Sequence, residues 1–452
     1  MTKSSRTLLG RLLFQDRGIV PTKRLLLFYF AVSACLLVGA IFQLSWQVIL
    51  IVNGLFLAFS LFDLLLSPGK KEVKVKRKIT DQLERGLQYT VELHVSNSSH
   101  HETNIRMIDG TPQSFIVRFP LQGKLAGNST STFYYDTVAH VRGDYKLSKL
   151  YLRYRSILGL WEKQNAIELV DKVKVIPDLS ETKKVIESAQ QFLLYDGVKI
   201  RKQRSGVGEF AKIRSYVVGD DPRKINWRQT AKLQEVMTNE YEPEHGKYIT
   251  ILIDCGRMMG AELKRGNRLE KSIEAALTVA AAALQKGDYV SVLAFSKDVK
   301  VFIPAAKGME HLQTIIHQVY NLTVDTAESN YAVVLHYLET KQKKRSLLLL
   351  FSDVHTFLHE DNALLYLKRL RRRHLFLTIG IEDETLLKNL KSEPVDVQSA
   401  MVKSMAQNQA LVKKREKAKW EKNGLLMVEA REEKLATTAV SYYIDMMNRG
   451  LL

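Results

Sequence analysis

The sequence has almost no cysteine and lacks the short motifs that identify common enzyme sites. Of its 452 residues two are cysteine. Cys35 lies in an apolar run and Cys255 follows a predicted strand, so we expect no disulfide framework and a reducing compartment for most of the chain. No cysteine–histidine spacing suits zinc. There is no phosphate-binding loop around Gly206 and Gly208, and no Gly-x-Ser-x-Gly nucleophile elbow.

Acidic residues are also scarce relative to basic ones. The chain has 67 lysines and arginines against 48 aspartates and glutamates, a net charge of +19. Such a surface suits anionic lipid, nucleic acid or an acidic partner. Hydrophobic residues make up 46% and charged residues 25%, which is typical of a folded chain. The length predicts about three domains.

Formal charge is nearly absent between Leu25 and Leu66, where Asp63 carries the only one. Two apolar runs, 25–46 and 48–66, are each about twenty residues long, enough to cross a bilayer as a helix. A short turn joins them, with Trp46 at the interface. The pattern predicts two transmembrane helices over 25–66. A cleaved signal peptide followed by a buried helix fits less well, because a signal peptide has a shorter apolar core.

Basic residues flank both predicted spans. They are concentrated in the N-terminal segment 1–24 and again in 70–78, whereas the turn between the spans has no charge. The positive-inside rule therefore places both ends in the cytoplasm. We expect a multi-pass inner-membrane protein with its soluble bulk in the cytoplasm, and membrane lipids as partners of its basic surface. Asp63 lies near the cytoplasmic end of its span, so its position favours snorkelling to the interface.

The next two segments differ in pattern. Residues 70–176 alternate apolar and polar positions between turn signals, which predicts a β-sandwich-like module. Residues 177–247 form a charged segment with a turn at Gly219-Asp-Asp-Pro222. Adjacent side chains usually point apart, so we expect Asp220 and Asp221 to cap the chain or to pair with Arg214 or Arg223. A binding role is the alternative.

Residues 248–452 alternate strongly apolar strands with amphipathic helices. This alternation predicts a doubly wound, mostly parallel α/β sheet covered on both faces. Two of its strands end in acids, Asp254 and Asp353. If those strands are neighbours, both carboxylates lie at the carboxyl edge of the sheet, where a hard cation could bind. The strand candidates are 248–254, 289–295, 299–303, 346–352, 375–381 and 425–428. The helix candidates are 268–285, 309–320, 330–340, 362–372, 399–422 and 432–448.

The 177–247 segment has a distinctive set of charged, aromatic and glycine residues: Glu209, Arg214, Tyr216, Gly219, Asp220, Asp221, Arg223 and Trp227. This set resembles the signature of the bacterial domain-of-unknown-function family 58. The resemblance covers nearly the whole chain and implies a C-terminal domain similar to a von Willebrand factor type A domain. Members of that family often occur beside MoxR-type AAA+ ATPases and are suspected of acting with them on other proteins. The resemblance therefore implies a role in interaction.

Von Willebrand type A domains often have a metal-ion-dependent adhesion site built on Asp-x-Ser-x-Ser, a threonine and a second aspartate. Here the first pattern is Asp254-Cys-Gly256-Arg-Met258, so both serines are lost. Asp353 matches the second aspartate, and Thr326 or Ser329 stands for the threonine. Mg²⁺ requires hard oxygen ligands. The resemblance thus implies a degenerate metal site of Asp254, Asp353 and Ser329, no resident cofactor, and at most weak Mg²⁺.

The sequence favours a membrane-anchored adaptor, working with a MoxR-type ATPase in protein assembly, maturation or envelope stress, over an enzyme. The alternative is a metal-dependent enzyme using Asp254 and Asp353. A transition-metal site at His355 and His359 is disfavoured, because Thr356 replaces the glutamate of a zinc-protease helix. Nucleic acid is not an expected partner, since the basic run 369–373 has no recognition motif beside it.

Overall fold

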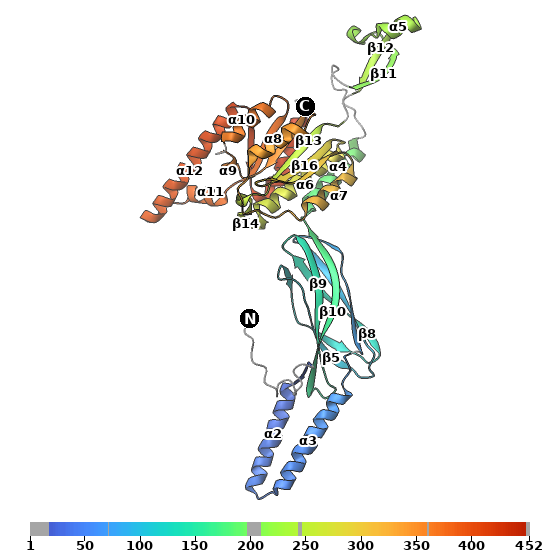
Figure 1. Ribbon diagram of the computed structural model, residues 1–452, viewed down its shortest axis with the longest axis vertical. Coiled ribbons are helices and arrows are strands. Elements are labelled where there is room, and N and C mark those ends of the chain that lie inside the picture. Colours follow the sequence, from blue (N-terminus) through green and yellow to red (C-terminus); the bar gives the residue numbers. More distant parts are fainter. Residues whose placement is uncertain (1–17, 71, 197–208, 243–245, 359–360, 449–452) are drawn as a thin grey trace. The chain divides into compact units, whose positions relative to one another are not determined.

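The structure is a computed structural model that describes residues 18–70, 72–196, 209–242, 246–358 and 361–448 (Figure 1). The chain divides into two compact units. The first ends at Ile176 and the second begins at Pro177. The first holds two apolar helices and a β module, and the second holds an α/β domain with a separate hairpin. The expected multidomain organisation is confirmed at this level.

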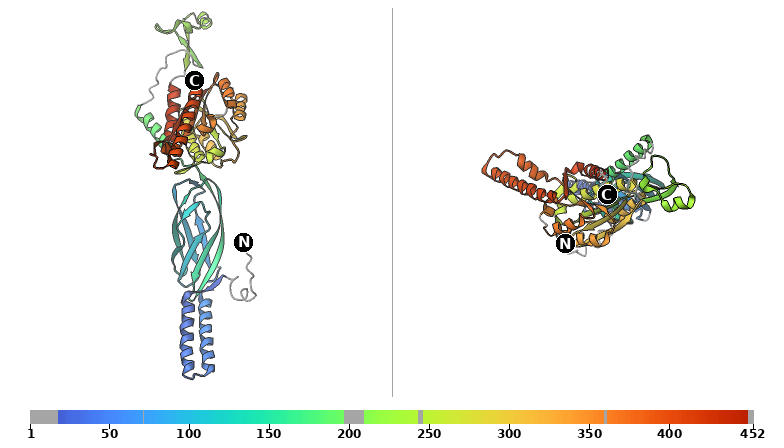
Figure 2. Two further views of the ribbon diagram at one scale, coloured as in Figure 1. Left: turned by 90° about the vertical axis from the view of Figure 1, so that its left-hand side faces the viewer. Right: turned by 90° about the horizontal axis from the view of Figure 1, so that it is seen from above.

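Two apolar helices begin the first unit. Helix α2 covers Lys23–Ile41 and α3 covers Trp46–Leu66, side by side in opposite directions (Figure 2). The hydroxyl of Thr22 caps α2 and that of Ser45 caps α3. Both helices are long and apolar enough to cross a membrane, a test that a signal sequence near the N-terminus also passes.

The β module consists of two sheets packed face to face. One has the order β2-β4-β8-β6, and the other β1-β10-β9-β5-β7, with β3 paired to β10. Alternate residues point inward, so that Val91 and Leu93 of one sheet share a buried cluster with Ile105 and Leu150 of the other. The strands are β1 (Ile19–Pro21), β2 (Val73–Lys78), β3 (Gln82–Glu84), β4 (Gln88–Asn97), β5 (Thr103–Asp109), β6 (Phe115–Val117), β7 (Leu121–Leu125), β8 (Ser129–Ala139), β9 (Gly143–Arg155) and β10 (Trp161–Ile176).

Asp63 attaches α3 to the β module. Its side chain is buried, with 1% of the residue exposed, and accepts hydrogen bonds from the N–H groups of Leu158 (2.9 Å) and Leu160 (3.2 Å) and the hydroxyl of Ser156 (2.6 Å). The indole N–H of Trp161 donates to the carbonyl of Ser60 on the preceding turn of α3 (2.8 Å). The expectation that Asp63 snorkels was wrong, because the 156–161 loop supplies the donors that water would otherwise supply.

The second unit is built on a six-stranded sheet with the order β17-β16-β13-β18-β19-β20. All neighbours are parallel except β17, which returns antiparallel beside β16. Counted along this domain, the order is third, second, first, fourth, fifth and sixth, which is a doubly wound sheet. The strands are β13 (Tyr248–Asp254), β16 (Tyr289–Phe295), β17 (Val299–Ala306), β18 (Ser346–Phe351), β19 (Leu375–Ile381) and β20 (Leu426–Ala430).

Helices form two groups on this sheet (Figure 1). In the first, α4 (Ser180–Asp196), α7 (Met309–Val319) and α13 (Leu435–Asn448) pack around α6 (Arg268–Gln285). In the second, α8 (Tyr331–Lys341) packs on α10 (Asp361–Leu370), and α9 (Val354–Leu358) packs on α12 (Val397–Lys422), which also contacts α11 (Glu384–Lys391). Helix α4 lies in the charged segment 177–247 of the sequence, yet the hydroxyls of Thr182 and Thr278 meet at 3.1 Å, so it is part of the α/β domain.

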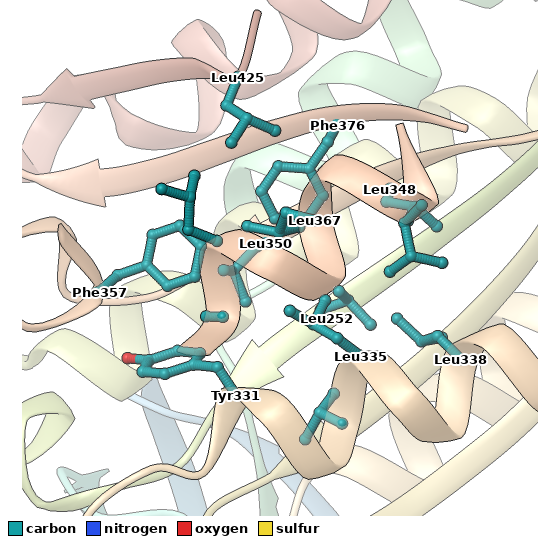
Figure 3. Packing of buried hydrophobic residues seen from close by; sticks show 14 of the residues in the cluster. Leu252, Tyr331, Leu335, Leu338, Leu348, Leu350, Phe357, Leu367, Phe376 and Leu425 are labelled. Carbon is teal, nitrogen blue, oxygen red and sulfur yellow. The ribbon is translucent and has the colours of Figure 1, made fainter. Parts of the chain in front are cut away.

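The second helix group packs on the sheet through a buried hydrophobic core (Figure 3). This core extends to the edge of the sheet at which the parallel strands end. Leu252 and Leu350 of neighbouring strands pack against Leu335 of α8 and against Phe357 of α9. Phe357 also holds the ring of Tyr331 edge-on, with ring centroids 4.9 Å apart. Tyr331 begins α8, so this packing fixes the phenol whose hydroxyl reaches the carboxyl edge of the sheet.

Candidate functional site

The strand order reverses beside β13, and the crevice at the carboxyl ends of β13 and β18 is where ligands bind in doubly wound sheets. Asp254 is the last residue of β13, and Ser352 and Asp353 follow β18. The two strands are hydrogen-bonded neighbours in register, with Ile253 opposite Phe351. The structure therefore brings both predicted acids to one edge.

Asp254 is surrounded by donors from its own domain. Only 1% of the residue is exposed. One carboxylate oxygen accepts from the N–H of Gly256 (2.8 Å) and from the hydroxyl of Ser329. The other accepts from the hydroxyls of Ser352 (2.6 Å) and Tyr331 (2.9 Å). With two donors on each oxygen, the carboxylate is satisfied without a ligand.

Ser329 occupies the space left by the glycine that replaces the first serine of the adhesion pattern. A Cβ on Gly256 would lie 2.0 Å from the Ser329 hydroxyl oxygen, so a side chain at 256 and the present position of Ser329 exclude one another. Of the two candidates for the threonine position, Ser329 is therefore the one that reaches Asp254, while Thr326 is exposed. Arg257, three residues after Asp254, pairs with Glu328 (3.0 Å).

Asp353 is neutralised by an arginine that sequence reasoning missed. Arg268, in the first turn of α6, forms an ion pair with one carboxylate oxygen, and the two side chains are 12% and 7% exposed. The other oxygen accepts from the N–H (3.0 Å) and the hydroxyl (2.7 Å) of Thr356. The guanidinium supplies the positive charge that a metal would supply at this carboxylate.

These contacts do not suit a tightly held Mg²⁺. The ion needs several hard oxygen ligands in near-octahedral geometry, yet both oxygens of Asp254 and of Asp353 already accept from protein donors. Gly256 has no oxygen in its side chain and Met258 offers only a thioether. Within the described part of the chain, no three His, Cys, Asp or Glu residues are grouped to hold a metal. Weak Mg²⁺ binding stays a prediction.

One further acid, Asp325, and two histidines, His355 and His359, belong to the same region. Asp325 accepts from the hydroxyl of Ser296 (2.8 Å) and pairs with Lys300 (3.1 Å). The Ser296 hydroxyl, a backbone N–H and Lys300 hold the pKa of the Asp325 carboxyl well below its usual range. His355 is exposed on α9, and His359 lies outside the described residues.

The signature residues form a separate hairpin in which β11 (Glu209–Ser215) pairs with β12 (Met237–Glu242). Arg214 and Asp220 make a bidentate ion pair, with both N···O distances 2.7 Å. This pair lowers the pKa of the Asp220 carboxyl, and the Tyr216 hydroxyl donates to the Asp220 carbonyl (3.1 Å). Gly219 has φ of +111°, which glycine adopts without strain. The expected pairing of Asp220 with Arg214 is thus present.

The rest of the signature holds a short helix on this hairpin. Asp221 caps the 3-10 turn Pro222–Lys224 by accepting from the N–H of Arg223 (3.0 Å). Asn226 caps α5 (Trp227–Leu233) and its amide donates to Asn239 of β12 (2.9 Å). We call residues 209–242 the signature hairpin.

The signature hairpin exposes large apolar side chains. Trp227 is 69% exposed and Val218 is 97% exposed. Val217, Leu233 and Val236 of the same hairpin are exposed as well. Single exposed apolar residues are ordinary, but five on one small, internally bonded hairpin are typical of a binding surface.

Parts of the chain are similar to known proteins. Residues 212–423 match the model of the family described as protein of unknown function DUF58. Residues 212–423 of the chain therefore belong to this family. The match contains most of the signature hairpin together with Asp254, Ser329 and Asp353, and ends before β20. The apolar helices and the β module of this DUF58 protein lie outside it.

Individual relatives are distant. The uncharacterized protein YeaD of Bacillus subtilis (strain 168) is 24% identical over 207 residues, which cover 44% of this chain. The DUF58 chain spans about half, 48%, of the length of that curated relative. The conserved hypothetical protein BatB from Bacteroides thetaiotaomicron is 12% identical, covering 45% of this chain and 100% of its own, with a TM-score of 0.30. A PapD-like domain of human CEP192 is 11% identical, covering 25% and 87%, with a TM-score of 0.18.

The carboxyl of Asp254 gives the DUF58 domain a pH-dependent stability. Burial raises the pKa of Asp254 and outweighs its four hydrogen bonds, which lower it. The folded chain then binds this proton more tightly than the unfolded chain, whose aspartate pKa is about 3.9. The associated stability is fully present below that pH and is lost as pH rises through the folded-state pKa.

We therefore expect the wild type to lose stability relative to Asp254→Asn as pH rises above about 4, by up to about 1.4 kcal/mol per pH unit. Asparagine imitates the protonated acid, because Tyr331 and Ser352 can accept from its amide. Hydrogen exchange of β13 and β18 amides in the full-length protein measures the difference. A wild type that instead gains stability with pH would mean that the four donors outweigh burial.

Proposed function

We propose that this DUF58 protein is a membrane-anchored interaction protein that presents its signature hairpin to a partner in the cytoplasm. The observation that supports this most directly is the set of exposed apolar side chains, led by Trp227, on a hairpin held by the Arg214–Asp220 ion pair. Apolar and aromatic anchors of this kind dominate the energetics of protein interfaces. An enzyme's reactive groups are not required for such a role.

The α/β domain, in this proposal, is a von Willebrand type A-like domain whose adhesion site has lost its metal chemistry. The doubly wound strand order and the position of Asp254 at the end of the first strand support it. Ser329 donates a hydrogen bond to Asp254, and Arg268 neutralises Asp353. The edge then stabilises the domain, and partner binding passes to other surfaces.

The anchor in this proposal is the pair α2 and α3, spanning the inner membrane with both ends in the cytoplasm. The length and apolar composition of the helices support it, as do the basic residues on both sides of the pair. The family resemblance points to a MoxR-type AAA+ ATPase as the partner, and to assembly, maturation or protection of other proteins as the task.

A photo-crosslinking amino acid at position 227 of the full-length protein tests the partner. We expect a nucleotide-dependent crosslink from position 227 to an AAA+ ATPase, and none from position 411, where Leu411 of α12 is equally exposed at 67%. Arg214→Ala removes the ion pair but keeps the crosslinking amino acid at position 227, and should abolish the crosslink by releasing the turn. Equal crosslinking from 227 and 411, or none with any nucleotide, would contradict the proposal.

A further inference from the structure

The outer face of the larger β-module sheet has a groove lined by basic side chains. Two adjoining hollows of about 340 and about 470 Å³ share Arg106 and Arg153 as lining residues. Lys124 and Arg155 line the first, and Lys70 lines the second. Volumes above roughly 300 Å³ are large enough for a small-molecule group. We call this the basic groove.

Basic side chains outnumber acidic ones in the basic groove, although Lys124 also pairs with Glu102, outside the lining, at 3.3 Å. Arg106 of β5 and Arg153 of β9 are directly opposite one another across the antiparallel pair, an arrangement that destabilises a sheet when both residues are charged alike. Glu162 is the one carboxylate among the described lining residues. Its oxygens lie 3.8 Å from Arg153 and 3.9 Å from Arg155, beyond hydrogen-bond distance. An anion between the arginines would relieve this repulsion.

The strand register places the groove beside the start of the first apolar helix. Val20 of β1 is opposite Glu162, and Glu162 is opposite Arg155. Val20 precedes the α2 cap Thr22 by two residues, about 7 Å along an extended strand. The next row, with Arg153 and Arg106, lies about 7 Å further. A bilayer's polar layer is about 5–8 Å deep on each side, so the first row, with Arg155, lies at headgroup depth if α2 spans a membrane. Arg155 lines the same hollow as Arg153 and Arg106 of the next row, so this hollow leads from headgroup depth to the two opposed arginines.

We propose that the basic groove binds the phosphate headgroup of an anionic phospholipid in the leaflet next to the β module. This inference rests on the membrane anchorage proposed above. The recognising chemistry is that of arginine forks toward phosphate oxygens, which guanidinium groups contact bidentately. Bound lipid neutralises the opposed arginines and fixes the β module against the membrane surface, in addition to the attachment made by Asp63.

The test uses full-length protein, stripped of lipid in detergent and titrated with phosphatidylglycerol or phosphatidylcholine under native mass spectrometry. We expect preference for phosphatidylglycerol, and about thirty-fold weaker binding of it by the double variant Arg106→Gln/Arg153→Gln, from about 1 kcal/mol per basic residue. The matched control is Lys146→Gln/Lys172→Gln. Those lysines are also opposite one another across β9 and β10, but they line neither hollow, and binding should not change.

Three results would overturn the inference: equal binding of both lipids, equal loss in both double variants, or inorganic phosphate binding as tightly as phosphatidylglycerol, which would assign the groove to a free anion. Unchanged hydrogen exchange of the backbone amides of β9 verifies that the variants fold. Retention of the protein in alkali-washed membranes reports on the anchorage separately. Loss of retention would reject the anchor, whereas retained protein without lipid preference rejects only the groove.

Discussion

Replacing Arg77 by alanine is expected to destabilise the β module by about 3–5 kcal/mol, because breaking a buried ion pair leaves a charge without compensation. Arg77 of β2 lies between the two sheets, and its side chain and that of Asp109 are both fully buried. The guanidinium donates twice to Asp109, at 2.8 and 2.5 Å, and once to Asp171, at 2.8 Å. Tyr135 adds a fourth contact by donating to Asp109 (2.8 Å).

The pKa directions agree with this picture. Burial pulls the pKa of Arg77 down, but its hydrogen bonds with Asp109 and Asp171 outweigh burial and hold the pKa above its ordinary value. Burial, together with the neighbouring Asp109, raises the pKa of the Tyr135 hydroxyl. Without the guanidinium, Asp109 would retain one hydroxyl partner for a buried negative charge, whereas Asp171, whose side chain is 36% exposed, could turn to water.

Hydrogen exchange of the β2, β5 and β9 amides in the full-length protein measures this loss, since a global melting curve would mix the two units. Lys78→Ala is the matched control on the same strand. The Lys78 side chain is 72% exposed and its ammonium lies 3.2 Å from a carboxylate oxygen of Glu92. The substitution should therefore lower the stability of the module by less than about 1 kcal/mol. If Arg77→Ala were as mild as Lys78→Ala, the buried cluster would contribute little to the stability of the module.

In the α/β domain, the bounds of a strand could be predicted closely from the sequence where polar residues flank an apolar run. The strands 248–254, 289–295 and 375–381 begin and end at the predicted residues. Each is an almost continuous aliphatic run, a signal that a covered parallel strand produces. The β module was harder. Strand β7, for example, is five residues long and contains Gly123, where a Cβ would lie 2.3 Å from the Phe133 ring, a contact that only the fold reveals.

Some residues of the candidate site could likewise be predicted from the sequence, and others could not. Asp254 and Asp353 were predictable because each follows an apolar strand, and parallel strands end at one edge. Ser329 was a candidate only through the family resemblance, and Arg268, which neutralises Asp353, was missed. Arg268 is 85 residues from Asp353 in sequence, and Ser329 is 75 residues from Asp254. The packing of α6 and of the loop before α8 brings both into place, and no local spacing encodes it. The same reason explains Asp63, whose partners follow it by 93 to 97 residues.

Replacing Asp254 by alanine is expected to destabilise the α/β domain by about 2–6 kcal/mol. The substitution leaves the buried Gly256 N–H and the partly buried Ser329 hydroxyl without their acceptor, at about 1–3 kcal/mol for each. Tyr331 and Ser352 lose less, because their hydroxyls already lie 2.8 Å apart and can bond to one another. Hydrogen exchange of β13 and β18 amides measures the change in the full-length protein.

Mg²⁺ should make little difference to this comparison. A ligand that binds only the folded state stabilises it in proportion to its concentration over its Kd. Because protein donors occupy the oxygens of Asp254 and Arg268 neutralises Asp353, we expect hydrogen exchange of the β13 and β18 amides in the wild type to be nearly the same with and without Mg²⁺. A rise in stability is read as slower exchange of these amides. Arg268→Gln removes the competing cation and is the informative control. A Mg²⁺-dependent rise that appears only in this variant would show that the arginine took the place of the metal, whereas a large rise in the wild type, absent in Asp254→Ala, would mean that the adhesion site still binds its ion.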